Sequence, residues 1–151
     1  GAKKKISEEN VAKVYDFFKG HTFYMQKTFN ETFADTSVNE ECSGEKIKAA
    51  ISVLVDSYDT IFREILSNVP EKQKELLYAI AIDGEASSIT SSAFIRRHRL
   101  SSASSVQSAI KKLLEKDLVT VSHKVYSISD RFFALWLATQ MGPDDPLQSL
   151  V

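Results

Sequence analysis

The first third of the chain carries apolar residues at helical spacing. Between residues 11 and 18 they recur at i, i+3, i+4 and i+7, which predicts an amphipathic helix over about residues 7–19 with Ser7 as its N-cap. Gly20 ends this helix. Met25, Phe29 and Phe33 then recur every fourth residue and predict a second helix over about residues 22–34. The two helices are rich in Phe and Tyr, so we expect an aromatic helical hairpin that packs against another surface.

The middle of the chain predicts a loop and then one long helix. Residues 35–44 are polar and show no periodicity. From Ile47 to Ile65 apolar residues keep a spacing of three to four, which predicts a single helix over about residues 45–68. Such a helix would span roughly 35 Å at 1.5 Å per residue. Pro70 stops it and opens the next helix.

From residue 71 onwards the pattern predicts three helices. The first covers about residues 71–82 and ends at Asp83-Gly84. A short helix over residues 91–98, capped by Thr90, is followed by a turn at residues 100–102. Ser101 or Ser102 then caps a helix over about residues 103–116. The predicted buried residues of the first and third helices are Leu76, Leu77, Ile80, Ala81, Val106, Ile110, Leu113 and Leu114.

Two short β-branched runs follow these helices. Residues 118–121 and 124–128 flank Ser122-His123 and predict a β-hairpin. Asp130 caps a last helix that runs to about Gln140, Gly142-Pro143 ends it, and residues 144–151 are predicted to be a frayed tail. We expect the aromatic residues of this part to be core. They are Tyr126, Phe132, Phe133 and Trp136.

The order helix, turn, helix, hairpin, helix is that of a winged helix-turn-helix. The predicted fold class is therefore mainly α: a helical, lid-like part followed by a winged helix-turn-helix with a small β-hairpin wing. We expect the first region to cover residues 6–69, the winged helix residues 70–141, and a C-terminal tail residues 142–151.

The net charge of −1 hides a strong asymmetry along the chain. Residues 30–90 hold five positive and twelve negative side chains, whereas residues 91–124 hold seven positive and two negative ones, a net charge of +5. A basic segment that coincides with a helix-turn-helix pattern favours a polyanionic partner such as DNA. The alternative is an ordinary solvated face.

The second helix of the motif supplies the candidate base-reading residues. Because its buried side is fixed by periodicity, its outward residues follow from helical geometry. They are Ser104, Gln107, Ser108, Lys111 and Lys112. Gln pairs well with adenine and Lys with guanine or phosphate, while short hydroxyls favour phosphate contacts. We therefore expect weak base preference.

The flanking segments supply further candidate DNA contacts. Three arginines end the preceding helix, where they could bind phosphate or interact with the helix dipole. Ser102 begins the next helix, and His123 and Lys124 lie at the wing tip, where they could contact the DNA backbone or simply be exposed. The complete candidate DNA-binding set is Arg96, Arg97, Arg99, Ser102, Ser104, Gln107, Ser108, Lys111, Lys112, His123 and Lys124.

The sequence offers little for catalysis, so we expect no enzyme activity, cofactor or metal. It has no P-loop, no His/Cys/Asp/Glu spacing typical of a metal site, and no nucleophile paired with a base. The lone Cys42 excludes an internal disulfide and fits a cytoplasmic location. His21 is more typical of a structural than a catalytic residue. No apolar run approaches the ~18 residues of a membrane span.

Three segments resemble one family of proteins. Residues 100–119, Leu-Ser-Ser-Ala-Ser-Ser-Val-Gln-Ser-Ala-Ile-Lys-Lys-Leu-Leu-Glu-Lys-Asp-Leu-Val, resemble the recognition-helix segment of prokaryotic AAA+-type, STAND-like ATP-binding proteins of the archaeal type. Residues 125–137 are similar to their closing signature, a wing strand followed by Asp-x-Phe-Phe-x-x-Trp. Residues 19–26 resemble the Gly-x-Pro-Phe-Tyr turn of their helical lid, with Thr22 where proline is usual. The resemblance covers about residues 6–140.

The resemblance implies a partner and a function. The family's P-loop core would lie upstream, and because the chain starts Gly-Ala-Lys without Met, we expect it to be a piece of a longer protein. Without that core, we expect the aromatic side chains of the lid-like part to be partly exposed, so that the protein self-associates or binds other apolar surfaces through them. These side chains are Phe17, Phe18, Phe23, Tyr24 and Phe29. The leading interpretation is a non-catalytic recognition region that binds DNA or a partner protein. The alternatives are a free-standing winged-helix regulator with an N-terminal dimerisation or sensing part, and a winged helix used only for protein contact.

Overall fold

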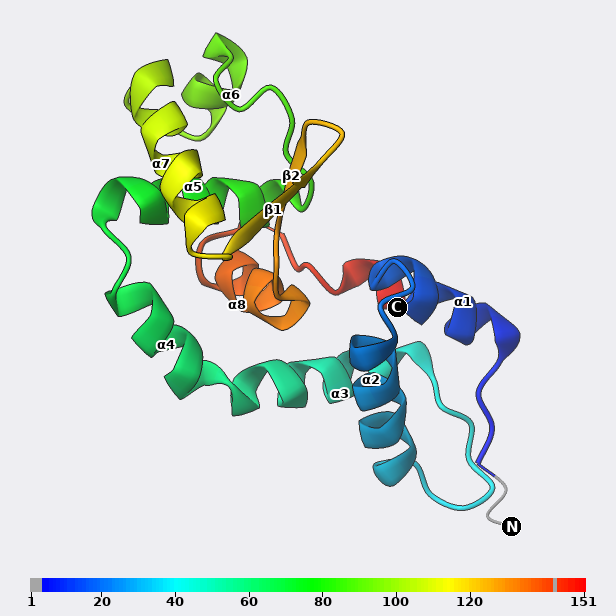
Figure 1. Ribbon diagram of the computed structural model, residues 1–151. Helices are drawn as coiled ribbons and strands as arrows, with labels where there is room; N and C mark the ends of the chain where they lie inside the picture. Colours follow the sequence, from blue (N-terminus) through cyan, green and yellow to red (C-terminus); the bar gives the residue numbers. More distant parts are fainter. Residues whose placement is uncertain (1–3, 143) are drawn as a thin grey trace. The chain divides into compact units, whose positions relative to one another are not determined.

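The computed structural model of the protein describes residues 4–142 and 144–151 and is mainly helical (Figure 1). Within those residues it has eight α-helices, one antiparallel pair of strands after the seventh helix, and a short 3₁₀ helix near the C-terminus. The predicted fold class is therefore confirmed. The chain divides into two compact units, one running up to Asp59 and including residues 144–151, the other beginning at Thr60. No helix in the described part is long and apolar enough to span a membrane.

The first unit begins with two helices that match the prediction closely. Helix α1 covers Glu8–Phe17 and α2 covers Thr22–Ala34. The Ser7 hydroxyl caps α1 by accepting the Asn10 amide at 3.1 Å. Gly20 has a φ of +73°, and a Cβ at this position would lie 3.0 Å from the Tyr15 hydroxyl oxygen. A side chain there would be strained and crowded, which is why a glycine follows α1.

Threonines, and not aromatic residues, form the most buried positions of α2. Thr28 and Thr32 are fully buried, whereas Met25, Phe29 and Phe33 are only half-buried. The Thr32 hydroxyl donates to the Thr28 carbonyl at 2.7 Å. The apolar spacing thus predicted the helix correctly, but its fully buried residues are small threonines, which let α2 pack closely on α3.

The long helix predicted over residues 45–68 is wrong. Helix α3 covers Gly44–Ser57 and a separate helix α4 covers Asp59–Ser67. At the break the Tyr58 amide bonds the Val55 carbonyl at 3.1 Å, three residues back, and the Ser57 hydroxyl bonds the Leu54 carbonyl at 2.6 Å. These tighter bonds end α3, yet a one-residue interruption barely changes the apolar spacing, so periodicity alone continues across it. The division between the two units also falls here, which groups α4 with the second unit.

The C-terminal segment packs in the first unit and is not a frayed tail. The 3₁₀ helix Gln148–Leu150 contacts α1 and α3, and Leu147 and Leu150 are buried. Gly44 lies so close to the Leu150 carbonyl that an added Cβ would be 2.3 Å from its oxygen. A hydrogen bond from Lys48 to Asp145 lowers the pKa of the Asp145 carboxyl. Polarity and the proximity of the chain end predicted a free tail, but two buried leucines hold it. Of the predicted helix terminator Gly142-Pro143, Pro143 lies outside the described residues.

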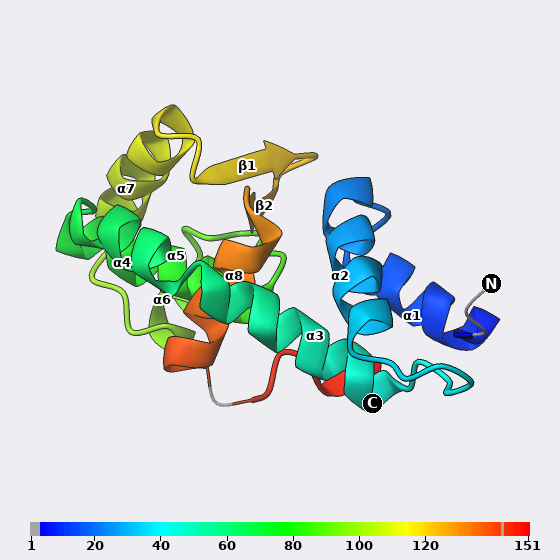
Figure 2. The same cartoon turned by 90° about the horizontal axis from the view of Figure 1, so that it is seen from below.

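The second unit has the predicted order of elements (Figures 1 and 2). After α4 come α5 (Glu71–Asp83), α6 (Ser92–Arg97), α7 (Ala103–Glu115), β1 (Val119–Ser122), β2 (Val125–Ile128) and α8 (Arg131–Met141). Helix α5 contacts α7, α8 and β2, which makes it the centre of the unit. The predicted buried residues Leu76, Leu77, Ile80 and Ala81 of α5 are all buried.

Hydrogen-bonded caps fix where these helices begin. Ser91, and not the predicted Thr90, caps α6 by accepting the Phe94 amide at 3.2 Å. Ser102 caps α7 by accepting the Ser105 amide at 3.1 Å. Asp130 caps α8 through one carboxylate oxygen that accepts the Phe132 and Phe133 amides at 2.9 and 3.0 Å. Each cap satisfies amides that the helix itself leaves unpaired.

The wing is a β-hairpin with a two-residue turn, and this turn lies one residue later than predicted. Ser122 pairs with Val125, so the turn consists of His123 and Lys124, and both have positive φ angles of 50° and 64°. Positive φ at both positions is typical of a type I′ turn, which suits the twist of a hairpin. Ala86 also forms a bridge to Tyr126, with N–O distances of 2.9 and 2.8 Å.

Aromatic side chains form a cluster between α4 and α8 in the second unit, where core residues were expected. The ring of Phe62 on α4 lies 5.0 Å from Phe133 and 5.8 Å from Trp136, measured between centroids. The Arg63 guanidinium lies 5.6 Å above the Trp136 ring. Phe62, Phe132, Phe133 and Trp136 are buried, whereas Tyr126, which was also expected in the core, is only half-buried. This cluster joins α4 to α8 and explains why α4 belongs to the winged-helix unit.

Replacing Thr28 with valine is expected to stabilise the protein. The Thr28 hydroxyl is buried and has no hydrogen-bond partner among the described residues. Removing an unsatisfied buried hydroxyl at constant shape should raise the free energy of unfolding by about 1 kcal/mol. Thr32→Val is the matched control, since it removes the hydrogen bond from the Thr32 hydroxyl to the Thr28 carbonyl and should not stabilise the protein. Urea denaturation measures both, and a Thr28→Val variant less stable than wild type would contradict the prediction.

Candidate nucleic-acid interface

Helix α7 separates cleanly into a buried and an exposed side. Val106, Ala109, Ile110 and Leu113 are buried, and Leu114 is half-buried. The outward residues that the sequence predicts are all exposed; they are Ser104, Gln107, Ser108, Lys111 and Lys112. The periodicity therefore placed both sides of this helix correctly.

The polar groups on the outward side of α7 are mostly free to meet a ligand. Gln107 and Lys111 have no side-chain partner among the described residues. Lys112 lies 3.3 Å from Glu115, an exposed ion pair of the kind worth less than about 1 kcal/mol. Ser102 differs, because its hydroxyl oxygen accepts the Ser105 amide at 3.1 Å and lies 3.2 Å from the Ser104 hydroxyl. Its first role is to cap the helix.

The three arginines at the end of α6 have different surroundings, although the sequence grouped them. One guanidinium nitrogen of Arg97 lies 2.5 Å from an Asp83 carboxylate oxygen, and its guanidinium carbon lies 5.5 Å above the Phe94 ring. Among the described residues, Arg96 bonds only the Ser92 carbonyl of its own helix, at 3.4 Å. Arg99 has no side-chain partner in the described part of the chain. Arg97 therefore holds α6 against the end of α5, whereas Arg96 and Arg99 remain available.

Asp83 is a residue that the sequence marked only as a helix terminator. Its second oxygen lies 3.0 Å from His98 Nε2. The side chain of His98 is only 9% exposed, and its ring centroid lies 4.6 Å from that of Phe94. One carboxylate thus contacts both Arg97 and His98 and fixes the approach to α7. Nothing in the local sequence signals this, because the partners lie 14 and 15 residues away.

The wing tip presents two exposed basic residues. The Nδ1 atom of His123 lies 3.1 Å from the Ser122 hydroxyl, and Lys124 has no side-chain partner among the described residues. Beside them on β1, Val121 is 46% exposed. A turn of this kind can approach a phosphate backbone, and its apolar neighbour can also meet a protein.

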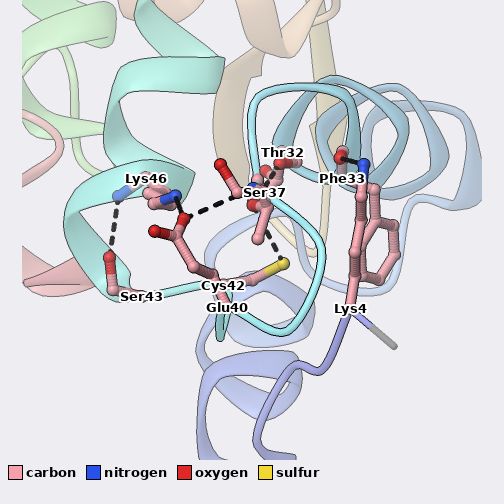
Figure 3. Close-up of polar contacts among 9 residues, drawn as sticks. Lys4, Thr32, Phe33, Ser37, Glu40, Cys42, Ser43 and Lys46 are labelled. Carbon is pink, nitrogen blue, oxygen red and sulfur yellow. Dashed lines mark hydrogen bonds and ion pairs between the residues drawn. The ribbon is translucent and has the colours of Figure 1, made fainter. Parts of the chain in front are cut away.

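The first unit has a network of polar contacts around a buried cysteine, drawn in Figure 3. Cys42 is fully buried, and its sulfur lies 3.4 Å from the Thr36 hydroxyl. A hydrogen bond from Lys46 at 2.7 Å lowers the pKa of the Glu40 carboxyl, which also accepts the Ser37 amide at 3.3 Å. These bonds order the loop before α3. Burial removes Cys42 from the set of accessible nucleophiles.

The described residues contain no group of three His, Cys, Asp or Glu side chains that could hold a metal ion. An open cavity of about 440 Å³ lies in the first unit, lined by Lys5, Ile6, Ser7, Asn39, Glu40 and Glu41. His21 is exposed, with its ring centroid 6.2 Å from that of Tyr24. None of these places assembles a nucleophile with a base. The outward face of α7 and its flanks are the candidate site that the geometry defines best.

Helices α7 and α8 and strand β2 contact α5, Ser102 caps α7, and a hairpin wing follows α7. Together these features define a winged helix-turn-helix protein. A family model described as "Probable winged helix domain" matches residues 60–139, just over half of the chain, and the chain belongs to this family. The match begins where the second compact unit begins. Comparison with curated proteins and with solved structures gave no match.

Removing the Arg97 side chain is expected to destabilise the winged-helix unit. Arg97→Ala loses the ion pair to Asp83 and the contact with the Phe94 ring, and should lower the free energy of unfolding by about 0.5–1 kcal/mol, a small value because the pair is partly exposed. Arg96→Ala is the control and should change it by less than about 0.5 kcal/mol. Thermal and urea denaturation measure both. Equal effects of the two substitutions would show that the Asp83 contact does not stabilise the unit.

Proposed function

We propose that this chain is the non-catalytic recognition region of a larger AAA+-type, STAND-like ATPase, and that its winged helix binds duplex DNA mainly through phosphates. The observation that carries the DNA part is the exposed polar face of α7, flanked by the available guanidinium groups of Arg96 and Arg99. Serine hydroxyls and cationic groups on one accessible face suit a phosphate backbone.

The chemistry of this face favours affinity over sequence selectivity. Gln107 is the residue best suited to a bidentate contact with a base, whereas Ser104 and Ser108 carry single hydroxyls. Lys111 and Lys112 supply charge that releases counterions from DNA. The expected binding is therefore weak, nearly independent of sequence and strongly dependent on salt.

The ATPase part of the proposal is supported by the sequence resemblance of residues 19–26, 100–119 and 125–137. In that family a P-loop core precedes the helical lid, so the core would be the first partner of this chain. A P-loop encoded upstream of Ala2 in the native gene would distinguish this proposal from a free-standing winged-helix regulator.

A second candidate function is docking of a partner protein. The exposed Val121 on the wing favours it, since an apolar side chain beside cationic groups suits a mixed protein surface better than a phosphate backbone.

Self-association through the first unit also stays a prediction. Phe18 is buried there, whereas Phe23 is 55% exposed and Phe17, Tyr24 and Phe29 are half-buried.

Fluorescence anisotropy on duplex DNA across a salt series tests the DNA proposal. Wild-type protein should bind at low salt, and the double variant Arg96→Ala/Arg99→Ala should flatten the slope of log affinity against log salt by about 1.8, roughly 0.9 for each lost phosphate contact. Arg97→Ala is the matched control and should keep most of the slope, because Asp83 neutralises it. If wild type fails to bind, or the double variant keeps the full slope, the basic face is a protein-docking or solvated surface.

The chain by itself is expected neither to bind nor to hydrolyse ATP, because its sequence lacks the Gly-x-x-x-x-Gly-Lys-Ser/Thr loop that cradles phosphates. Isothermal titration calorimetry with Mg²⁺ and ATP, together with a phosphate-release assay, checks this. Micromolar affinity, with hydrolysis abolished by a point substitution within these residues, would disprove the proposed non-catalytic role.

A further inference from the structure

The C-terminal segment, residues 144–151, packs on the first unit although it follows α8, the last helix of the second unit. Its 3₁₀ helix contacts α1 and α3, and Figure 1 draws it in red beside the blue α1. Leu147 is 6% exposed and Leu150 is 1% exposed. We call the surface of α1 and α3 that covers these two leucines the α1–α3 seat.

The contacts of the C-terminal segment are those of a short peptide ligand. The Lys48 ammonium on α3 donates to the Asp145 carboxylate, which raises the pKa of Lys48 and lowers the pKa of Asp145. The same carboxylate accepts the Leu147 amide at 3.0 Å. Because Gly44 has no side chain, the Leu150 carbonyl can lie where an added Cβ would be 2.3 Å from its oxygen. The seat therefore recognises the pattern Asp-x-Leu-x-x-Leu.

Only a short stretch of chain ties this segment to the second unit. Helix α8 ends at Met141, and three residues separate Met141 from Asp145. Because the contacts that hold the segment come from residues 145–150, the segment of another copy can make the same contacts. The tether gives the segment an effective concentration on the order of mM at its own seat, so another copy competes at protein concentrations of that order.

We propose that the α1–α3 seat is an interface between two copies of this chain, in which each copy places its C-terminal segment on the seat of the other. Such an exchange keeps every contact described above. It is closed by two-fold symmetry, because each copy offers one segment and one seat. The charges are complementary, since the Asp145 carboxylate of one copy meets the Lys48 ammonium of the other. This interface uses neither the winged helix nor its candidate DNA-binding face.

Charge reversal distinguishes exchange between copies from packing within one copy. Lys48→Asp and Asp145→Lys each place like charges at the seat, and the repulsion is the same whether the segment stays at home or is exchanged. In an equimolar mixture of the two variants, exchange restores an attractive pair at both seats of a mixed dimer. The mixed dimer should therefore form about tenfold more tightly than the wild-type dimer, because two exposed pairs change sign.

Sedimentation equilibrium and native mass spectrometry measure the dimers at protein concentrations on the order of 0.1–1 mM. The double variant Lys48→Asp/Asp145→Lys is the matched control, since it restores the attractive pair within each copy and should dimerise as wild type does. Leu147→Ala/Leu150→Ala removes the buried anchors and should abolish the dimer. Phe23→Ser removes an exposed aromatic side chain of the same unit and should leave dimerisation unchanged.

The outcomes separate this interface from other forms of self-association. A mixed dimer that forms more tightly than the wild-type dimer, and that the leucine substitutions abolish, supports exchange. If the mixture forms no more dimer than either charge variant alone, each segment stays on its own seat and the proposed interface is wrong. It is also wrong if the leucine variant dimerises as wild type does, or if Phe23→Ser abolishes the dimer, because another surface then joins the copies.

Discussion

Burial of one face of α5 is the constraint on which the winged-helix unit depends. Leu76, Leu77 and Ile80 are fully buried, and α5 contacts α7, α8 and β2. Fully burying side chains of this size contributes about 1.5–3 kcal/mol each, far more than any exposed ion pair of the unit. Because α7 presents its apolar side to α5, its polar side must face outwards. The candidate interface is thus a consequence of core packing.

Around that core, polar contacts decide which charges remain available. Asp83 lies beside both Arg97 and His98, so two of the basic groups between α6 and α7 serve the fold. Arg99 lies one residue further, in a left-handed conformation that directs the chain into the turn before α7. The net charge of a segment therefore overstates the charge that it can offer a ligand. Arg96, Arg97 and Arg99 look equivalent in the sequence, but only Arg97 lies beside the Asp83 carboxylate among the described residues.

The first unit uses different means to hold its helices. Two threonines, of which Thr32 bonds its own helix backbone, form the buried side of α2, and a loop ordered by Glu40 and Lys46 leads into α3. The C-terminal leucines return to this unit, and Gly44 leaves space for the Leu150 carbonyl. Segments that are far apart in the sequence therefore complete one core. Tyr15 and Phe23, each 55% exposed, are aromatic side chains that this core leaves largely uncovered.

Local rules made much of this protein predictable. Apolar periodicity and capping side chains predicted α1, α2, α5, α7, α8 and the wing, and the outward face of α7, because these features depend on residues within one or two turns. The burial of Thr28 and Thr32 and the packing of Leu147 and Leu150 could not be predicted in this way, since each depends on contacts between distant segments. The break at Tyr58 is local, but it was missed because an interruption of one residue barely changes the apolar spacing. The candidate site divides likewise. The sequence determined which residues of α7 face outwards. Only the tertiary structure decided that Arg97 forms an ion pair with Asp83, because the two residues are 14 positions apart and meet through the packing of α6 on α5.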